Sequence, residues 1–480
     1  MSEDVLDFII SLATKLGAQY CDVRIIKNRF RVIRSNNADI DFYEETNDGI
    51  GIRVLTNGSW GFSGSSSVER ELCKDLVEKA IKMARTTSMY NRKSIKLIDV
   101  KSLDGKYVNE FKKNPLTAEE TNVIDLLNTT TKTLKEQSDK ITSASASFKA
   151  FVEERYVATS EGSKIYQKLT GCGAIVQGKA MENGLVVSRS YPQTLDFNVA
   201  TKGYEWIEET DLVSKAAETG KELLKLLSAP SCPYGFTNLI LADDLLALQI
   251  HETIGHPTEL DRVLDTEWDF AGSSFLTPDK LGTLRFGSES VNVVADPTIS
   301  GGPGTYKYDD EAVEGKTVYL IKNGMFVGYQ SSREMAAKLN LEESSGGMRA
   351  MDGMHPPLIR MNNINLLPGD WTREEIISDT REGILMTGPI MEIFDQRRRT
   401  FIFGAEIGWR IKKGDLVEVI RNPVYCGKTL SFWQGCDAIA KDGWTHYSSG
   451  CGKGRPHQRV RVGHYCSMAR FVNVQVGAPV

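Results

Sequence analysis

The 480-residue sequence contains no apolar run that approaches the roughly 18 residues needed to cross a membrane. It also lacks an excess of positive charge, since 58 lysines and arginines face 63 aspartates and glutamates, for a net charge of −5. Proteins that bind nucleic-acid phosphates are normally basic, so direct nucleic-acid binding is not expected. The acidic, amphipathic start of the chain differs from a secretory signal peptide. These absences predict a protein without a membrane span.

Cysteine and histidine are sparse. None of the eight cysteines belongs to a Cys-x-x-Cys pair, and their spacings do not resemble a disulfide framework. Scattered cysteines of this kind are typical of reduced thiols, which predicts a cytoplasmic location. The chain has only six histidines, so a histidine-based site has few candidate residues.

The length exceeds what one hydrophobic core normally supports and predicts at least two domains. Segments with apolar residues at helical spacing are followed by segments in which apolar and polar residues alternate, as in β-strands. This order is typical of an α+β protein with antiparallel sheets. A linker at 229–233, containing two prolines, separates an N-terminal α+β domain (1–228) from a C-terminal domain (234–480). The first domain could divide again near residue 114. We expect each domain to combine an antiparallel β-sheet with packed helices.

Local turn and cap signals refine this expectation. Asn-Gly pairs at 57–58, 183–184 and 323–324 predict β-hairpins, and further turns are expected at 36–37, 47–49 and 413–415. The capping-box pattern, a serine or threonine followed three residues later by glutamate, predicts helices that start near Ser66, Thr117, Ser331 and Thr372.

The most informative stretch is His251-Glu-Thr-Ile-Gly-His256, at the end of an apolar helical pattern capped by Asp243 or Asp244. Neutral imidazoles bind zinc, and hydrolytic zinc enzymes place a general base beside the first histidine, here Glu252. The stretch therefore predicts a zinc site. The alternative is a buried histidine followed by a surface histidine, with Glu252 as an ordinary helix residue.

The spacing of this motif is unusual. Residues five apart on a regular α-helix point about 140° away from each other, so one metal could not bind both His251 and His256. Gly255 and Pro257 flank the second histidine and could open or stop the helix. We therefore predict that the helix is regular to about His251 or Glu252 and leaves α geometry before His256.

A third ligand must come from elsewhere. Cys451 lies in a glycine-flanked segment, Ser-Ser-Gly-Cys-Gly-Lys-Gly, where a thiolate could approach a metal closely. Two imidazoles and one thiolate with an open fourth position form a known type of catalytic zinc site. Spacing alone leaves other candidates open: Cys436, Cys466, His446, His457 and His464.

An acidic run is also a candidate for function. Asp309, Asp310 and Glu311 could bind a substrate's N-terminal amine, order a loop or support a metal ligand, or could simply form a solvated acidic turn. The preceding Gly301-Gly-Pro-Gly304 lacks the lysine and the serine or threonine of a phosphate-binding loop, so nucleotide binding is not expected. The arginine run at 397–399 is expected to be a solvated turn between strands.

Taken in order, these landmarks resemble the TldD/PmbA metallopeptidase family, once called modulators of DNA gyrase. The resemblance rests on the motif at 251–256, the acidic run at 309–311, the hairpin at 323–324, Leu367-Pro-Gly369 and Cys451-Gly-Lys453. Asp22-Val-Arg24 and the segment from Gly51 to Phe62 resemble the family's first domain, so the similarity spans nearly the whole chain.

The resemblance implies that His251, His256 and Cys451 bind one zinc ion and that Glu252 activates a metal-bound water. Because the motif is intact, the chain resembles the catalytic, TldD-type branch. It further implies hydrolysis of short or unfolded peptides in the enclosed cavity of a dimer, formed by two copies or with a motif-less paralogue. The chain departs from the family at Pro257-Thr-Glu259 and in its long basic tail at 458–480, which leaves substrate choice open.

Two other function classes remain open at this stage. The chain could be a non-hydrolytic, metal-containing binding or regulatory protein, and a fourth protein ligand from His446 or His464 would favour such a closed structural site. Alternatively, Cys451 could act with a nearby histidine as a metal-free cysteine hydrolase. A zinc enzyme resembling dipeptidyl-peptidase III is less consistent with the sequence, which lacks that family's second glutamate motif.

Overall fold

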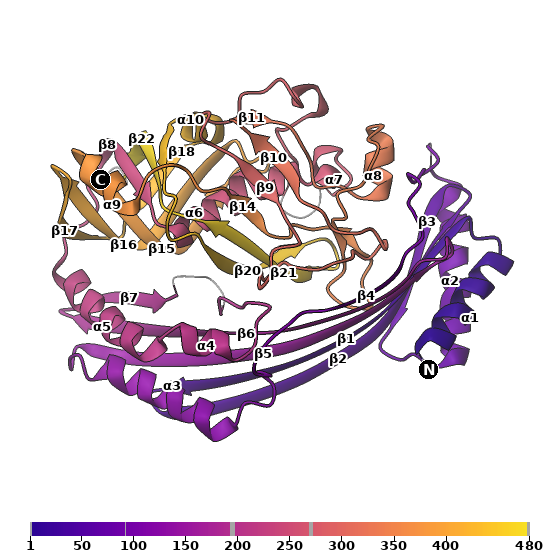
Figure 1. Ribbon diagram of the computed structural model, residues 1–480, viewed down its shortest axis with the longest axis horizontal. Helices are drawn as coiled ribbons and strands as arrows, with labels where there is room; N and C mark the ends of the chain where they lie inside the picture. The colour runs from indigo at the N-terminus through magenta and orange to yellow at the C-terminus, as the bar shows by residue number, and fades with distance from the viewer. Residues whose placement is uncertain (1, 92, 193–196, 268–271, 478–480) are drawn as a thin grey trace.

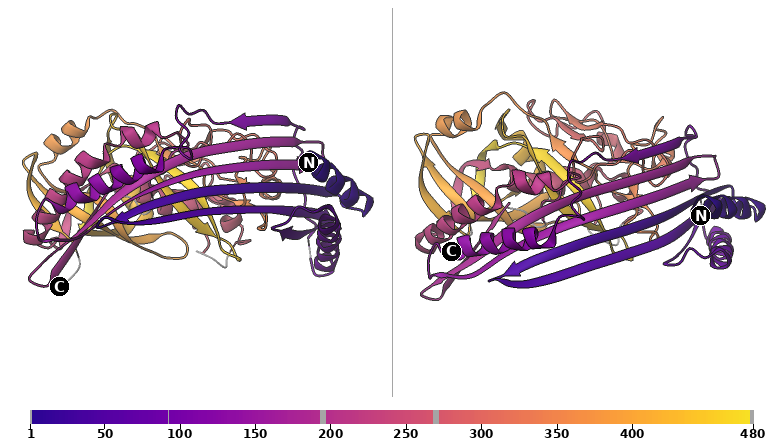
Figure 2. Two further views of the ribbon diagram at one scale, coloured as in Figure 1. Left: turned by 90° about the horizontal axis from the view of Figure 1, so that it is seen from below. Right: turned by 60° about the horizontal axis from the view of Figure 1, so that its bottom comes forward.

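The computed structural model describes residues 2–91, 93–192, 197–267 and 272–477. It has the predicted α+β architecture, with one large sheet in each half of the chain (Figure 1). The strands of the N-terminal sheet are long and curved, and the C-terminal half covers one face of this sheet (Figures 1 and 2). No helix among the described residues has both the length and the apolar character required to cross a membrane.

The N-terminal sheet has the order β3–β2–β1–β5–β6–β4, with β7 paired to β6. All neighbours are antiparallel except β4 and β6, which run parallel. The strands are β1 (Tyr20–Asn36), β2 (Asp39–Thr56), β3 (Ser59–Ser65), β4 (Asp104–Val108), β5 (Ile141–Thr159), β6 (Lys164–Glu182) and β7 (Leu185–Tyr191).

The helices of this half form two separate groups at opposite ends of the long strands (Figure 1). α1 (Ser2–Lys15) and α2 (Arg70–Ser88) bury apolar side chains at one end, including Ile9, Val77 and Ala80. At the other end lie α3 (Glu120–Lys135), α4 (Glu205–Glu209) and α5 (Leu212–Ser228), which share a second apolar cluster with β5 and β6. Strands from both sides of residue 114 belong to this one sheet, so the sheet is not divided there. The two groups of helices, however, pack into separate hydrophobic clusters.

The main C-terminal sheet has the order β15–β8–β22–β18–β16–β17, and β15 also pairs with β16, so five of its strands close into a ring. β19 is attached to β22. The strands are β8 (Gly235–Leu241), β15 (Glu382–Phe394), β16 (Thr400–Lys412), β17 (Asp415–Arg421), β18 (Val424–Lys428), β19 (Cys436–Ile439) and β22 (Ala469–Val476).

Among the described residues, three smaller sheets and five short α-helices complete this half. The sheets are formed by β9 (Val293–Ala295), β10 (Val318–Lys322), β11 (Met325–Phe326) and β14 (Ile364–Leu366); by β12 (Met348–Arg349) and β13 (Leu358–Ile359); and by β20 (Thr445–Lys453) and β21 (Gln458–Cys466). The α-helices are α6 (Asp243–Ile250), α7 (Leu260–Val263), α8 (Arg333–Lys338), α9 (Arg373–Asp379) and α10 (Thr429–Gln434).

The three Asn-Gly hairpins are confirmed. The asparagines at 57, 183 and 323 and the glycines that follow them all have positive φ, as a tight two-residue turn requires. The turn expected at 47–49 is wrong because these residues lie inside β2, where they continue to pair with β1. Long-range strand pairing therefore overrode a local turn signal.

The capping signals had mixed outcomes. Thr372 forms the full capping box with Glu375 at the start of α9, as predicted. Ser332, not Ser331, caps α8 by accepting a hydrogen bond from the Met335 amide. The boxes at Ser66 and Thr117 are wrong, because α2 and α3 begin later and have Glu69 and Glu119 at the N-cap without a side-chain bond.

Candidate metal centre

The motif helix widens into a π turn at the two histidines, where a regular α-helix would point their side chains apart. α6 ends at Ile250, a π-helical turn covers His251–Gly255, and a short 3-10 turn covers His256–Thr258. The His256 amide donates to the His251 carbonyl, five residues back. This wider turn brings the two imidazoles together, with ring centroids 4.8 Å apart. The prediction that α geometry ends before His256 is confirmed.

The start of the helix and the role of Gly255 differ from expectation. Ala242, not Asp243 or Asp244, occupies the N-cap. Gly255 has a φ of −57°, so it does not stop the helix in a left-handed conformation. A Cβ at this position would lie 2.1 Å from the Met361 Sδ, so any larger residue here would displace the Met361 side chain.

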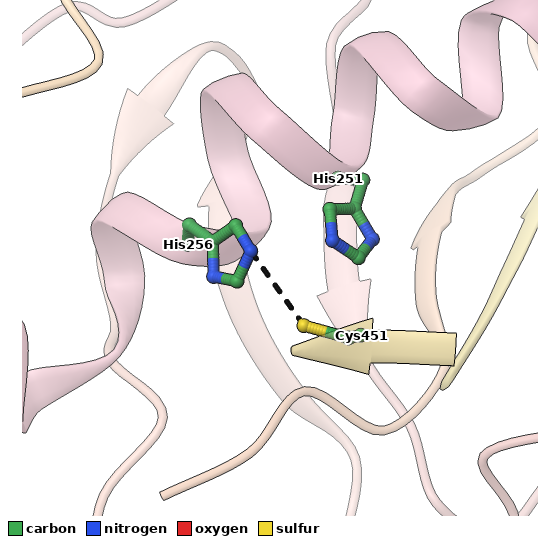
Figure 3. Close-up of side chains that lie close together, drawn as sticks. All are labelled: His251, His256 and Cys451. Atoms are coloured by element: carbon green, nitrogen blue, oxygen red, sulfur yellow. Dashed lines mark hydrogen bonds between the residues drawn. The ribbon is translucent and has the colours of Figure 1, made fainter. Parts of the chain in front are cut away.

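Cys451 joins the two histidines from a distant part of the chain. The donor atoms of His251, His256 and Cys451 all lie within 4.8 Å of one another, and all three residues are buried (Figure 3). The Cys451 Sγ is 3.6 Å from the His256 Nε2. The cysteine lies in β20 rather than in a loop, opposite Val460 of β21. In the described part of the chain this is the only such cluster of three or more potential ligands.

The other candidate ligands lie outside this cluster. His446 is buried and stacks on Trp206, with ring centroids 5.0 Å apart. His457 is exposed on the turn between β20 and β21. Cys436 is buried elsewhere in the core, and the Cys466 thiol donates to the Asp243 carbonyl.

The three donors fit a zinc ion. Zinc binds imidazole nitrogen at about 2.0–2.1 Å and thiolate sulfur at about 2.3 Å, which places tetrahedral donors about 3.5 Å apart. The observed Cys451–His256 separation of 3.6 Å is close to this value, and the remaining pairs are within 4.8 Å. The mixed nitrogen and sulfur donor set is also one that zinc accepts.

A chain of hydrogen bonds sets the tautomer of His251. The His464 Nδ1 lies 3.1 Å from the Ile364 carbonyl, which can only accept, so this nitrogen carries a proton. The His464 Nε2 is then the acceptor in its 2.8 Å contact with the His251 Nδ1. The His251 Nε2 consequently keeps its lone pair for a metal. Burial lowers the pKa of both histidines, which favours these neutral forms.

A carboxylate orients His256 in the same way. The Glu259 Oε2 accepts from the His256 Nδ1 at 2.8 Å and from the Arg262 Nε at 2.7 Å. The fully buried Lys453 ammonium lies 3.4 Å from the other Glu259 oxygen and 2.8 Å from Asp261. Burial acts to raise the pKa of Glu259, but Lys453, Arg262 and His256 outweigh it and hold this pKa well below its usual value. Glu259 is therefore a permanent anion behind His256.

Glu252 lies beside the donor cluster. Its Oε1 is 3.8 Å from the His251 Nε2, and its Oε2 is 3.2 Å from the Arg398 Nη1. Burial alone would raise the pKa of Glu252, but Arg398, His256 and His251 together lower it. Glu252 is therefore ionised at neutral pH, as a general base must be.

Arg398 is the residue whose role the sequence did not reveal. The arginine run does form the turn between β15 and β16, but only Arg397 and Arg399 are exposed as expected. Arg398 is 2% exposed, and its guanidinium lies 3.5 Å above the Phe394 ring. The prediction of a wholly solvated turn is wrong for this residue. No local signal distinguishes the central arginine from its two neighbours.

The Cys451 thiol is poised to ionise. Burial raises its pKa, but the neighbouring His256 and Arg360 side chains more than compensate and bring the pKa to about 7. A substantial share of this side chain is therefore thiolate at neutral pH, which is the form that binds metals or attacks electrophiles.

The acidic run at 309–311 has a different environment from the one expected. All three carboxylates are buried, so the solvated-turn interpretation is wrong. Asp310 accepts two hydrogen bonds from Arg155, at 2.8 and 2.9 Å, and Glu311 pairs with Arg53 at 2.9 Å. Both arginines belong to the N-terminal sheet. The run thus joins the two halves of the molecule, and its environment does not support the expected binding of a substrate amine.

Comparison with known families agrees with this geometry. Models of the PmbA/TldA metallopeptidase match residues 21–84 as domain 1, 113–227 as the central domain and 235–477 as the C-terminal domain. The chain belongs to the TldD/PmbA metallopeptidase family. A metalloprotease of Methanocaldococcus jannaschii is 35% identical over 424 residues, which cover 88% of this chain and 90% of the relative. A zinc metalloprotease TldD homologue of Saccharolobus solfataricus is 26% identical, over 90% of this chain and 91% of its own.

Two solved structures share the whole fold. A protein described as a modulator of DNA gyrase from Thermotoga maritima superposes with a TM-score of 0.79 at 15% identity, covering 99% of this chain and 100% of its own. TldE from Thermococcus kodakarensis has a TM-score of 0.75 at 17% identity, with 99% and 100% coverage. At such low identity these likenesses support the fold alone.

Proposed function

We propose that this TldD/PmbA family member is a zinc-dependent peptidase in which His251, His256 and Cys451 hold the ion and Glu252 is the general base. The observation that carries the proposal is the convergence of three buried donor atoms beside an ionised glutamate. The names of the relatives, metalloprotease and zinc metalloprotease, point to the same activity. When bound at this site, zinc would polarise the scissile carbonyl and acidify water.

The chain's own residues then account for the proton transfers. The Glu252 carboxylate takes a proton from the attacking water and delivers it to the nitrogen of the leaving amine. The Arg398 guanidinium, 3.2 Å from the Glu252 Oε2, holds the carboxylate in place and keeps it ionised. His464 and Glu259 accept hydrogen bonds from the Nδ1 atoms of His251 and His256, which keeps the free lone pairs of these two histidines directed at the donor cluster.

The direct test is the variant Glu252→Gln, which keeps the shape of the side chain but cannot accept the proton. We expect it to retain one zinc per chain, measured by elemental analysis, and to lose at least about 1,000-fold in kcat on an unstructured peptide. Glu374→Gln, which changes an exposed glutamate on α9, serves as the control and should keep wild-type activity. Wild-type turnover by a zinc-loaded Glu252→Gln protein would refute the assigned role.

A metal-free cysteine hydrolase is the second candidate, because Cys451 has a pKa near 7 and lies 3.6 Å from a histidine. Chelation and alkylation separate the two mechanisms. A zinc enzyme should lose activity on chelation and recover it when zinc is added back. Activity that survives thorough metal removal but disappears on alkylation of Cys451 would favour the thiol mechanism. A protein that holds zinc and cleaves no peptide would instead be a binding or regulatory member of the family.

We also propose that the substrates are short or unfolded peptides, cleaved within a cavity enclosed by a dimer. The ligand atoms are buried, so a folded protein could not present a backbone segment to them. The fold similarity to TldE allows either a second copy or a paralogue as the partner. Eight free thiols suit a reducing cytoplasm. Light scattering of the purified chain, alone and mixed with a paralogue, tests the assembly.

A further inference from the structure

A basic hollow lies between the N-terminal sheet and the β20–β21 hairpin, which carries Cys451. Its volume is about 450 Å³, and β1, β2 and β5 supply one wall while β12 and the hairpin supply the other. Figure 1 shows the hairpin directly above these long strands. Six of the lining residues are arginine or lysine, whereas only Glu45 and Glu153 are acidic. This local excess of positive charge contrasts with the net charge of −5 of the whole chain.

Internal ion pairs leave part of this charge unbalanced. Arg155 is neutralised by Glu153, at 2.7 Å, and by Asp310, at 2.8 Å. Arg461 shares Glu153 at 3.1 Å. Among the residues that the structure describes, Arg349 has no carboxylate partner within ion-pair distance. Arg155 and Arg461 therefore occupy the two carboxylates of the wall, and the Arg349 guanidinium is left without one.

Arg349 is the clearest sign of a missing anion. It is only 8% exposed, and its Nη2 donates to the carbonyls of Met361 and Arg461, while no acceptor contacts its Nε. Burial lowers its pKa to about 10, with a further contribution from the neighbouring cations Arg360, Arg155 and Arg461. A buried charge without a counter-charge is costly, so an anion entering the hollow would stabilise this arrangement.

We propose that the hollow binds a carboxylate group of the peptide substrate through Arg349 and Arg461. Arginine forks suit carboxylates, and the Arg461 guanidinium is held in the hollow by stacking 4.0 Å from the Phe151 ring centroid. The carboxylate is either the C-terminus of the peptide or an acidic side chain. Gly450 and Val460 line the hollow, next to Cys451 in sequence and opposite it in register, respectively. A bound carboxylate thus anchors the peptide beside the strand that presents the metal ligand.

This inference rests on the proposed peptidase function, but binding tests it without catalysis. The full-length, zinc-loaded Glu252→Gln protein is titrated into a fluorescent, unstructured peptide, and the anisotropy gives Kd. The peptide is prepared with a free or an amidated C-terminus, and with glutamate or glutamine at one internal position. We expect at least one carboxylate form to bind about tenfold more tightly than its neutral match, with the preference reduced at high salt. The pair that shows the preference identifies which carboxylate is bound.

Variants of the wall assign the preference to the hollow. Arg349→Gln and Arg461→Gln, each in the Glu252→Gln background, should bind carboxylate and neutral peptides about equally. Arg410→Gln is the matched control: Arg410 is 33% exposed and pairs with Glu418, much as the 25% exposed Arg461 pairs with Glu153. It should keep the full preference. If Arg349→Gln does not fold, the more exposed Arg461→Gln still decides the assignment.

The outcomes separate this inference from the proposed function. Equal binding of all peptide forms, or a preference that survives in both wall variants, would overturn the carboxylate site. A clear carboxylate preference in a protein whose zinc-loaded wild type cleaves none of these peptides would instead count against the peptidase proposal and leave the site intact.

Discussion

The two histidines of the metal centre are supported in different ways. Behind His256 stands Glu259, an anion neutralised by Arg262 and the buried Lys453. Behind His251 lies the neutral His464, whose Nδ1–H donates a hydrogen bond to the Ile364 carbonyl. A carboxylate partner increases the basicity of an imidazole ligand, whereas a neutral imidazole mainly fixes its tautomer and orientation. His256 is therefore oriented mainly by charge, and His251 mainly by geometry.

The largest expected effect comes from removing either ligand itself. His251→Ala and His256→Ala should each lose the single bound zinc and nearly all peptidase activity, because two remaining donors cannot complete the site. Elemental analysis after dialysis measures the zinc content, and His457→Ala, on the exposed turn, should keep it. If one of the two variants kept stoichiometric zinc, the two histidines would not share one ion.

Removal of the anion behind His256 should have the next largest effect. Glu259→Gln can still accept a hydrogen bond but loses the charge, so we expect zinc to bind about 10–100-fold more weakly. Competition with a chromogenic chelator gives the affinity. The same change leaves Lys453 with Asp261 as its remaining carboxylate partner, so Tm should also fall. Unchanged zinc affinity would show that charge behind His256 is unimportant.

The change behind His251 should be milder. In His464→Gln the amide oxygen could still accept from the His251 Nδ1, and no charge is lost, so zinc affinity should fall by about tenfold or less. The same chelator competition measures it alongside Glu259→Gln. A larger loss in His464→Gln than in Glu259→Gln would reverse the proposed division between charge and geometry.

The smallest effect concerns pH and the structural histidine His446. Burial, followed by the nearby Lys202, lowers its pKa to about 4, whereas the unfolded chain has a normal value near about 6.5. Below about pH 6.5 the His446 side chain therefore binds a proton in the unfolded state but not in the folded state. The free energy of unfolding consequently decreases as the pH falls towards 4. Near pH 5.5 this amounts to about 1 kcal/mol.

Comparison with the variant His446→Phe isolates this contribution. Tm of the metal-free wild type, measured by calorimetry, should fall more between pH 8 and pH 5.5 than Tm of the variant. Equal pH dependence in the two proteins would mean that His446 is solvated or already charged in the folded state. His251 and His464 also have lowered pKa values and add to the fall in both proteins.

Much of the fold was predictable where local chemistry decides it. The Asn-Gly hairpins at 57–58, 183–184 and 323–324 formed because only residues that tolerate positive φ suit such turns. Signals without that steric requirement were weaker. Serine and threonine at 66 and 117 do not cap helices, and residues 47–49 pair inside a long strand instead of turning.

By itself, the sequence determined the α+β class and the break in the motif helix. The five-residue spacing of His251 and His256 is incompatible with a regular α-helix around one metal, and the π turn agrees with that constraint. Tertiary structure alone decided which side chains surround these histidines. Cys451 and His464 lie about 200 residues away, and the burial of Arg398 and of the acidic run at 309–311 depends on packing between distant segments. Such contacts leave no local periodicity, because they arise only when separate strands and helices meet.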